Sequence, residues 1–412
     1  MKALILFIVL SVVMFVSVPK AQAAAAQLPW WNVQAIDTMK YSRDPSAQYL
    51  SNMPELNKVS DQMAKDIAAT GATHMVVDTP YDDQFLPILK VWVAAARKYN
   101  LHVWYRGNWS GWENWFGYAS ITRDQHIQKT KDFIIKNPDL FQEGDIFTAC
   151  PECENGGPGD PRLNGDAAGH RAFLIAEYKM MTETFRGIGK NVQVNYNSMN
   201  GDVARLIMDK ETTAALGGVV VIDHYVKTPA ELNYDISQIA QNSGGQVILG
   251  EFGAPIPDIH GNMTDDQQAD WIKQSLNLLA SNPDLAGLNY WTNMGGSTAI
   301  WTDKGVAKPA VAVITSYFKP QTIDGTIKNT LGSNIDQAIV QSTEKRVVTE
   351  NGNYEIAFVN GDEQVTISAD GYITQKMPIS QLKSQSNVIL EVENPNLWFK
   401  IREWFKNLFS QV

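Results

Sequence analysis

The sequence predicts an α/β protein in which a (β/α)₈ TIM barrel is followed by a small all-β sandwich and a C-terminal amphipathic helix. Three features of the 412 residues predict this fold. Between residues 33 and 320, short apolar runs alternate with longer stretches whose apolar residues recur every three to four positions. After Pro320, short alternating strands are separated by Asn-Gly and Asp-Gly turns. The last residues carry an apolar stripe at helical spacing.

Eight runs rich in β-branched and aromatic residues are the expected barrel strands. Helical stretches at 84–100, 170–189 and 264–282 lie between them, and one at 308–320 follows the eighth. Such a series fits a barrel of about 250 residues that accepts insertions. A doubly wound open sheet is the alternative, although no glycine-rich phosphate motif follows the first run. The expected strands are residues 33–39, 73–79, 101–107, 145–151, 192–198, 219–225, 246–252 and 285–291.

The region after the barrel is predicted to form a β-sandwich at 321–393. Its Gly-Asn-Tyr strand and Asp-Gly-Tyr turn resemble the carboxypeptidase-regulatory-like, prealbumin-type sandwich, which implies a spacer or surface-interaction module. The helix predicted at 394–412 either lies in a membrane interface or docks on the protein's own domains. Its apolar face consists of Leu397, Trp398, Ile401, Trp404, Phe405, Leu408 and Phe409.

The N-terminus has the pattern of a secretory signal. Lys2 precedes an apolar run, and Ala21-Gln22-Ala23 forms a small-residue cleavage site, so residues 1–23 are the predicted signal peptide and the barrel is expected at 28–320. An uncleaved anchor is the alternative. Either reading places the mature chain outside the cytoplasm, secreted or at the cell surface. The net charge of −10, without a Lys/Arg block, argues against nucleic acid as a partner.

Catalytic residues of (β/α)₈ enzymes sit where the strands end. The ends of the expected strands are rich in carboxylates, amides and aromatic rings. Cleavage of a glycosidic bond needs two carboxyl groups, one to protonate the leaving oxygen and one to attack or to activate water. Glutamates after strands 4 and 7 can face each other across the barrel mouth. The strand ends carry Asp37, Asp78, Tyr105, Arg106, Glu152, Glu154, Asn195, Asn197, Asp223, His224, Tyr225, Glu251, Trp291 and Asn293.

Three short motifs of the barrel resemble the clan A, family 5-like glycoside hydrolases. They are "VILGEFGA" at 247–254, "DHY" at 223–225 and Trp291 after strand 8. The resemblance implies that Glu251 is the nucleophile, that His224 and Tyr225 flank it with Tyr225 hydrogen-bonded to it, and that Trp291 is an aromatic platform.

The strand-4 region departs from that family. The family carries Asn before its acid/base glutamate, whereas this chain has Pro151 before Glu152 and a cysteine before Glu154. Glu152 is the predicted acid/base because it lies nearest the strand end, and Glu154 remains the alternative. The contact to the sugar 2-hydroxyl is then expected from Asn195 or Asn197.

Further substrate-binding residues are expected around this pair. Trp109 and Trp112, in the loop after strand 3, are the candidates for stacking on pyranose rings, although packing on neighbouring helices is the alternative. Arg106 either holds Glu251 ionised, binds substrate hydroxyls or makes a structural salt bridge. Asp37 and Asn293 complete the predicted substrate-binding set.

Cys150 and Cys153 are the only cysteines and frame Glu152. Structural zinc needs about four ligands, and a redox C-x-x-C motif opens a helix rather than ending a strand. A disulfide that braces the loop is therefore the prediction. The mechanism requires neither cofactor nor metal, although the loop at 157–166 could hold a calcium ion.

The combined prediction is a retaining glycoside hydrolase that acts on a poly- or oligosaccharide. Two alternatives stay open: a non-catalytic carbohydrate-binding barrel, and a surface adhesion protein whose β-domain and terminal helix make the contacts. Contact with a membrane or cell surface through the terminal helix is a further expectation.

Overall fold

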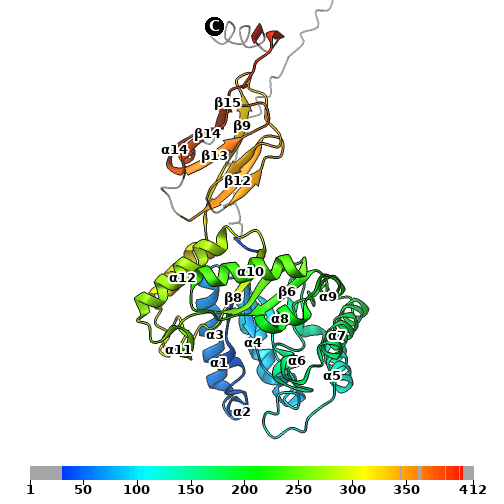
Figure 1. Cartoon of the computed structure of the whole chain (residues 1–412). Coiled ribbons are helices and arrows are strands. Elements are labelled where there is room, and N and C mark those ends of the chain that lie inside the picture. Colours follow the sequence, from blue (N-terminus) through cyan, green and yellow to red (C-terminus); the bar gives the residue numbers. More distant parts are fainter. Residues whose placement is uncertain (1–29, 344, 360–363, 386, 399, 402–412) are drawn as a thin grey trace, which may run out of the picture.

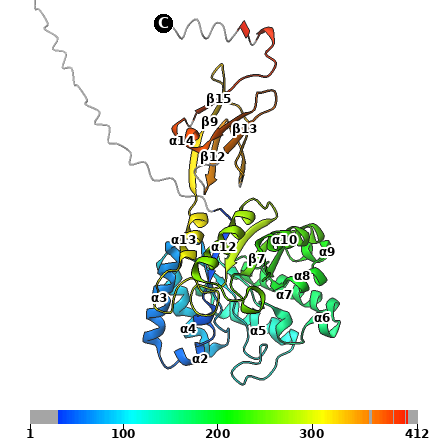
Figure 2. The ribbon, with the colours of Figure 1, turned by 60° about the vertical axis from the view of Figure 1, so that its left-hand side comes forward.

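The computed structural model describes residues 30–343, 345–359, 364–385, 387–398 and 400–401. A large α/β body carries a smaller β-domain at one end (Figures 1 and 2). The predicted signal peptide and most of the predicted terminal helix lie outside the described residues. Within the described part of the chain, no helix has the length and apolarity to cross a membrane.

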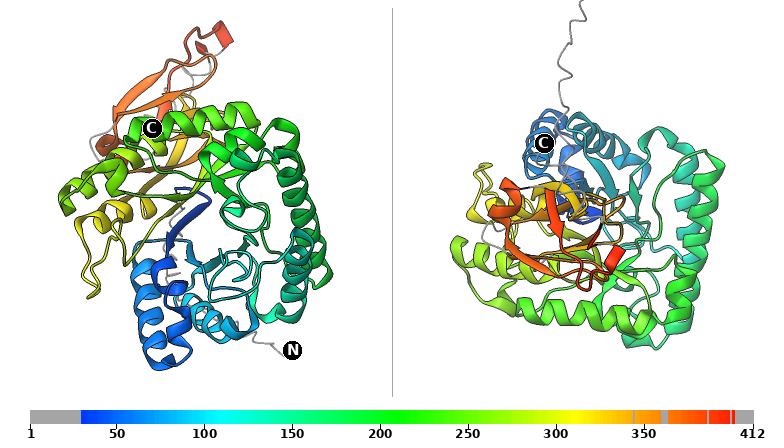
Figure 3. Two further views of the ribbon diagram at one scale, coloured as in Figure 1. Left: turned by 60° about the horizontal axis from the view of Figure 1, so that its bottom comes forward. Right: turned by 90° about the horizontal axis from the view of Figure 1, so that it is seen from above.

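Eight parallel strands in the order β4-β3-β2-β1-β8-β7-β6-β5 form the sheet of the large body. A parallel bridge between Ile146 and Gln193 joins β4 to the segment before β5, and the sheet thereby curls into a ring surrounded by helices (Figure 3). The predicted (β/α)₈ barrel is confirmed. Its strands are β1 (Val33–Asp37), β2 (His74–Val77), β3 (His102–Tyr105), β4 (Ile146–Phe147), β5 (Ser198–Asn200), β6 (Val219–Asp223), β7 (Gln246–Phe252) and β8 (Leu285–Tyr290).

Strand 5 differs from the prediction of 192–198. Gln193 pairs only with β4, and the chain pairs with β6 only from Ser198, opposite Val221. The apolar alternation of this segment is therefore shared between two neighbours. The strand itself begins where the prediction ends.

The helices wrap the sheet on its outer side (Figure 3). Two of the long ones start with capping boxes, at Thr122 with Gln125 and at Thr264 with Gln267, which satisfy otherwise free backbone N–H groups. The long helices are α3 (Met53–Ala69), α4 (Leu86–Lys98), α5 (Arg123–Lys136), α7 (Ala167–Gly187), α10 (Pro229–Ser243), α12 (Asp265–Ala280) and α13 (Pro309–Phe318). Shorter ones are α1 (Met39–Ser42), α2 (Ser46–Tyr49), η1 (Asp83–Phe85), η2 (Pro138–Leu140), η3 (Cys153–Asn155), α6 (Pro161–Asn164), α8 (Gly201–Ile207), α9 (Lys210–Ala215) and α11 (Pro257–His260).

The inside of the ring has its own apolar core, separate from the layer between sheet and helices. Trp104 of β3 is fully buried there, and its ring lies edge-on to Tyr196 at 5.4 Å. Its indole Nε1 donates to Thr148 Oγ1 at 3.0 Å, and that hydroxyl donates to the Tyr196 carbonyl at 2.6 Å. Trp104, Tyr196 and Thr148 thus fill the inside of the barrel and support the polar residues at the ends of its strands.

The β-domain consists of two small sheets, β11-β10-β13-β14 and β12-β9-β15, with an apolar core of its own. It meets the barrel at the end where strands begin: Lys345 Nζ donates to the carbonyl of Trp30, just before β1, at 2.8 Å. The domain therefore lies opposite the catalytic rim expected of the barrel. Its elements are β9 (Gln321–Asn329), β10 (Ile339–Gln341), β11 (Arg346–Val348), β12 (Asn353–Phe358), β13 (Gln364–Ser368), β14 (Gln375–Pro378), α14 (Ile379–Ser384) and β15 (Asn387–Leu390).

Candidate active site

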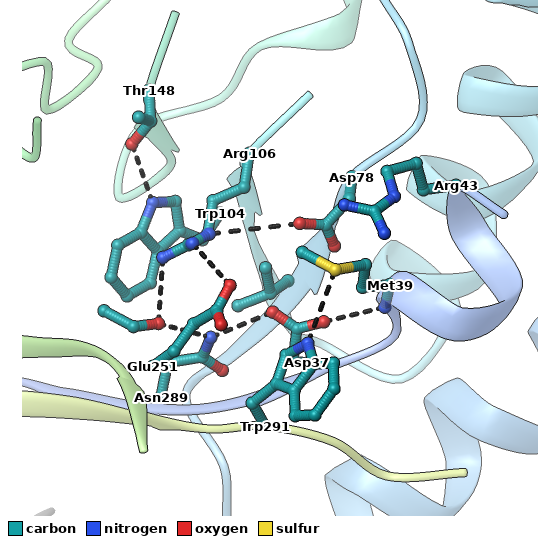
Figure 4. A network of polar contacts seen from close by, with 12 residues as sticks. Asp37, Met39, Arg43, Asp78, Trp104, Arg106, Thr148, Glu251, Asn289 and Trp291 are labelled. Carbon is teal, nitrogen blue, oxygen red and sulfur yellow. Dashed lines mark hydrogen bonds and ion pairs between the residues drawn. The ribbon is translucent and has the colours of Figure 1, made fainter. Parts of the chain in front are cut away.

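Glu251, near the end of β7, is a buried carboxylate held at both oxygens. Arg106 Nη2 donates to Oε1 at 2.7 Å (Figure 4), and the Tyr225 hydroxyl donates to Oε2 at 2.8 Å. Both donors come from strand ends, β3 and β6, as does Glu251 itself. The carboxylate thus has a fixed orientation and donors that favour its ionised form.

Arg106 is the hub of this network. It donates to both oxygens of Asp223, at 3.2 and 2.9 Å, and to the carbonyl of Gly250 at 2.9 Å. Its Nε lies 3.9 Å from Asp78 Oδ1. A Cβ at position 250 would come within 2.4 Å of Asp223 and 2.9 Å of Arg106, so only glycine fits beside the hub.

Asp37, at the end of β1, belongs to the same network (Figure 4). Its Oδ1 accepts from the backbone N–H of Met39 at 2.7 Å, and its Oδ2 accepts from Asn289 Nδ2 at 3.0 Å. Trp291 follows β8 and is half-buried, and its Nε1 lies 3.4 Å from Met39 Sδ. The Trp291 ring stands edge-on to the Tyr225 ring, with the ring centroids 6.0 Å apart. Trp291 therefore lies beside Tyr225, which donates a hydrogen bond to Glu251.

Four buried carboxyl groups thus surround one buried guanidinium. Burial raises the pKa of Asp37, Asp78 and Glu251, and neighbouring carboxylates add to the effect at Asp78 and Glu251. Arg106 acts in the opposite direction on all three. Arg43 also lowers the pKa of Asp37 and Asp78, but burial outweighs both cations, so Asp37, Asp78 and Glu251 hold a proton more firmly than isolated carboxyl groups do.

Glu152 lies across from this cluster, in the loop after β4. Its backbone has φ 47° and ψ 52°, a left-handed conformation that non-glycine residues rarely adopt and that recurs at functional sites. Its N–H donates to the Ser198 carbonyl at 2.9 Å, and its Oε2 accepts from Asn155 Nδ2 at 2.7 Å. Burial, with Asp223 and Glu154 nearby, raises the pKa of Glu152 to about 8.

Glu152 and Glu251 line the same cavity of about 130 Å³. A disulfide joins Cys150 and Cys153, whose Cα atoms are 5.2 Å apart, on either side of Pro151 and Glu152, so the predicted disulfide is confirmed. The cavity is completed by Met39, Arg43, Arg106, Asn108, Glu113, Trp115, Pro151 and Asn155.

Glu154, the alternative acid/base, points elsewhere. Its Oε1 accepts from the N–H of Asn200 at 2.6 Å and from the Asn200 amide Nδ2 at 2.9 Å. It is buried and does not line the cavity that Glu152 and Glu251 share. The geometry favours Glu152.

Several other predicted residues do not meet in this cavity. His224 turns into a neighbouring hollow of about 560 Å³, where its Nε2 lies 2.7 Å from Asp235 Oδ2. Asn293 is buried, and its side chain accepts from the N–H of Met294 at 2.6 Å. Asn195 is a correction: its amide donates to the carbonyl of Gly217, which precedes β6, so it lies at the opposite end of the barrel.

Trp109 and Trp112 are the second correction. These residues are 4% and 1% exposed, too little for a sugar to stack on their rings. Trp109 Nε1 donates to Thr130 Oγ1 at 3.1 Å, and Trp112 stacks on Phe173 at 5.3 Å. The prediction that these two rings stack on sugars was wrong, because the loop folds back onto α5 and α7. Packing on neighbouring helices was the stated alternative.

Besides Met39 and Pro151, the prediction missed five residues that line the cavity. Trp115, from the same aromatic loop, is half-buried and lies under the Arg43 guanidinium at 5.1 Å. Its position among five neighbouring aromatic residues was the one available signal. The others, Arg43, Asn108, Glu113 and Asn155, come from loops whose course has no periodic pattern.

No group of three metal-ligating side chains occurs in the described ranges. In the loop at 157–166, Asp160 pairs with Arg162, and Asp166 pairs with Arg123 at 2.8 Å while capping α7. These carboxylates are thus engaged with protein partners, unlike those of a ready calcium site.

No family model and no curated protein sequence matches the chain. Among solved structures, a GH5_18 protein of Bifidobacterium longum subsp. longum in complex with Manβ1-4GlcNAc is similar over 87% of this chain and 90% of that chain, with 12% identity and a TM-score of 0.51. β-Glucuronidase 2 of Bacteroides uniformis is similar over 81% of this chain at 11% identity and a TM-score of 0.46, and the chain spans only 44% of its length. At 12% identity, the likeness to the GH5_18 protein shows a shared fold alone.

Proposed function

We propose that the protein is a retaining glycoside hydrolase acting on an oligo- or polysaccharide. The observation that carries the proposal is that Glu152 and Glu251 line one cavity in contrasting surroundings. Glu251 receives two hydrogen bonds, one of them from a guanidinium, whereas Glu152 receives one from an amide. This chemistry needs one carboxyl group that holds a proton and one that is ionised. The guanidinium and hydroxyl donors at Glu251 favour its ionised form and oppose the burial that raises its pKa.

The proposed reaction has two steps. Below about pH 8, the protonated Glu152 donates its proton to the glycosidic oxygen, and the bond from that oxygen to the anomeric carbon breaks while Glu251 forms a covalent bond to that carbon. Glu152, now a carboxylate, then takes a proton from water. The resulting hydroxide displaces Glu251, which releases the sugar and restores both groups.

Neighbouring residues support each step. Arg106 and Tyr225 hold Glu251 in place for attack, and Trp291 offers a ring face for the sugar. Asn197, one residue before the carbonyl that anchors Glu152, has a buried Nδ2 without a hydrogen-bond partner in the described part of the chain. It is our candidate for the 2-hydroxyl contact.

The test compares three variants on two kinds of substrate. A panel of 2,4-dinitrophenyl glycosides (glucoside, mannoside, galactoside, xyloside, N-acetylglucosaminide and glucuronide) needs no acid for departure of the phenolate, while natural glycans, including Manβ1-4GlcNAc, do. Glu251→Gln should be inactive on both. Glu152→Gln should lose the natural substrates but form a glycosyl-enzyme from the activated ones, with turnover restored by azide.

Glu154→Gln is the matched control, because it removes a charge two residues away. If Glu154→Gln behaves as expected of Glu152→Gln, the acid/base assignment moves to Glu154. If folded wild type releases nothing from the panel yet binds glycans in affinity electrophoresis, the protein is a carbohydrate-binding barrel instead.

We also propose that the protein is secreted or held at the cell surface, on the strength of its N-terminal signal pattern and its apolar C-terminal stripe. Leu397 and Trp398, at the described start of that stripe, are 75% and 73% exposed. Co-sedimentation with anionic liposomes, with and without residues 395–412, tests the surface contact. Equal pelleting would exclude the membrane contact and favour docking of the helix on the protein's own domains.

A further inference from the structure

A third glutamate, Glu113, reaches the catalytic cavity from the loop between β3 and α5. It is half-buried, and Asn108 Nδ2 donates a short hydrogen bond to its Oε1. Within the described residues, Oε2 has no comparable partner. This oxygen is therefore free to accept from a group that enters the cavity.

Behind Asn108 lies a continuous buried relay. His126 Nε2, from α5, is 2.9 Å from Asn108 Oδ1, and His126 Nδ1 is 2.7 Å from Oε1 of Glu177, on α7. His126 and Glu177 are both fully buried. The relay thus runs from the outer helices to the loop that lines the cavity.

The hydrogen-bond partners assign the orientation of the relay. Asn108 Oδ1 also accepts from the N–H of Trp109 at 2.8 Å, so the amide nitrogen faces Glu113. His126 Nε2 must then carry a proton. At Nδ1 the proton lies either on the imidazole or on Glu177, and the pair is neutral overall in both cases.

Aromatic rings close this relay off from water. Trp112 stands edge-on to His126 at 4.5 Å, and Phe173 packs against both rings. The burial of Trp112, which removes it from sugar binding, is what encloses the relay. Within this enclosure, Glu177 Oε1 holds His126 and His126 holds Asn108, so each hydrogen bond restricts the orientation of the next side chain.

We propose that Glu113 binds hydroxyl groups of the substrate in the catalytic cavity, and that Asn108, His126 and Glu177 are positioning residues that hold its carboxylate there. This inference rests on the proposed function. It assigns the relay a role in recognition, whereas loop anchoring alone would affect stability only.

Electrostatics gives Glu113 a second effect. Burial raises the pKa of Glu113 to about 7, with Glu154 adding to the shift while Asn108 and Arg43 oppose it. The groups that face Glu152 are Asp223, Glu154, Arg106 and Glu113, and of these only Arg106 lowers its pKa. Ionised Glu113 therefore helps keep Glu152 protonated, so its removal should lower the pH at which the acid is lost.

The test uses the full chain and whichever dinitrophenyl glycoside and natural glycan the wild type cleaves. Glu113→Gln should raise KM about 10- to 100-fold, the range for lost hydrogen bonds to a charged group, and should move the alkaline limb of kcat/KM on the natural glycan to lower pH. Glu177→Gln should change KM in the same direction by a smaller factor. Glu183→Gln, an exposed charge removal on the same helix, should change neither.

Unchanged KM and pH profile in Glu113→Gln, in protein that is active, would overturn this inference and leave the proposed function intact. A lower melting temperature in Glu177→Gln without a KM change would reduce the relay to a structural role. A wild type inert on every glycoside overturns both proposals together.

Discussion

Both ends of the barrel bury carboxylates, but the two ends differ in how these carboxylates are paired with cations. At the end where strands begin, Asp145 is fully buried, pairs with Arg97, and accepts from the N–H groups of Val103 at 3.0 Å and Gln142 at 2.8 Å. At the end where strands finish, Asp78, Asp223 and Glu251 share Arg106, Asp37 accepts from Asn289 in the same network, and a cavity opens beside them.

The difference separates a structural ion pair from a candidate site. One anion matched to one cation, with its remaining lone pairs satisfied, is a way to connect β3, β4 and α4. An excess of buried anions at a cavity opposes folding and persists where it performs chemistry. The same residue type therefore has opposite consequences at the two ends, which substitutions can measure.

Glu251→Gln should give the largest effect. Loss of the nucleophile should lower kcat by at least about 10⁴-fold, in the range found when a catalytic group is removed. The measurement is turnover of the best dinitrophenyl glycoside, with circular dichroism to check folding. Activity within tenfold of wild type would remove Glu251 from the mechanism.

Asp145→Asn should lower stability at the end of the barrel where the strands begin. The change leaves Arg97 without its buried partner, and we expect a loss of about 3 kcal/mol in the free energy of unfolding. The specific activity below the melting transition should stay unchanged. Urea unfolding measures the loss, and Asp139→Asn, which alters an exposed carboxylate nearby, is the control. A catalytic defect in folded Asp145→Asn would contradict the division between the ends.

Tyr225→Phe removes the hydroxyl that donates a hydrogen bond to Glu251 Oε2 and keeps the aromatic ring. We expect kcat to fall about 10- to 100-fold with little change in KM, because the oriented carboxylate matters most during attack. Tyr234→Phe, at an exposed position on α10, controls for the loss of a hydroxyl. Equal kcat values for the two variants would deny Tyr225 a role.

Glu152→Gln should give the smallest effect on stability, and its sign is informative. The pKa of Glu152 is about 8 in the folded protein and about 4.3 in an unfolded chain, so the folded state binds more protons between these values. The contribution of Glu152 to the free energy of unfolding therefore falls as the pH rises from about 4.5 to 8. Glutamine does not titrate, so the variant should gain stability relative to wild type at pH 8.

The gain should be on the order of 1 kcal/mol, or a few degrees in melting temperature, at pH 8 and should shrink toward pH 5. Differential scanning fluorimetry at both pH values measures it. A gain that is equal at pH 5 and pH 8 would mean that Glu152 does not titrate in this range.

The barrel was predictable because its signals are local. Each strand is a short apolar run, each helix repeats its apolar residues along one face, and the ends of parallel strands must meet. From that rule the sequence predicts Asp37, Arg106, Tyr225, Glu251 and Trp291 at one end of the barrel, and in the structure they lie close together there. The rule of strand ends failed for Asn195, because the chain pairs with β4 at Gln193 and with β6 only from Ser198.

No comparable rule predicts from sequence which loop residues come together. The aromatic loop after β3 contains several tryptophans that look equivalent in sequence, yet Trp112 closes a buried relay while Trp115 lines the cavity. Glu152 and Glu154 are likewise separated only by where their hydrogen-bond partners, Asn155 and Asn200, lie in space. Such choices depend on long-range packing that a single segment does not encode.

The sequence by itself determined the (β/α)₈ architecture, the disulfide and the set of strand ends at which the carboxylates gather, because periodicity and spacing act over a few residues. The tertiary structure alone decided which glutamate faces Glu251, which tryptophan remains accessible and that Glu113 joins the cavity through His126 and Glu177. Those features need residues far apart in the chain to be brought together, and only the packing of α5, α7 and the loops after β3 and β4 does so.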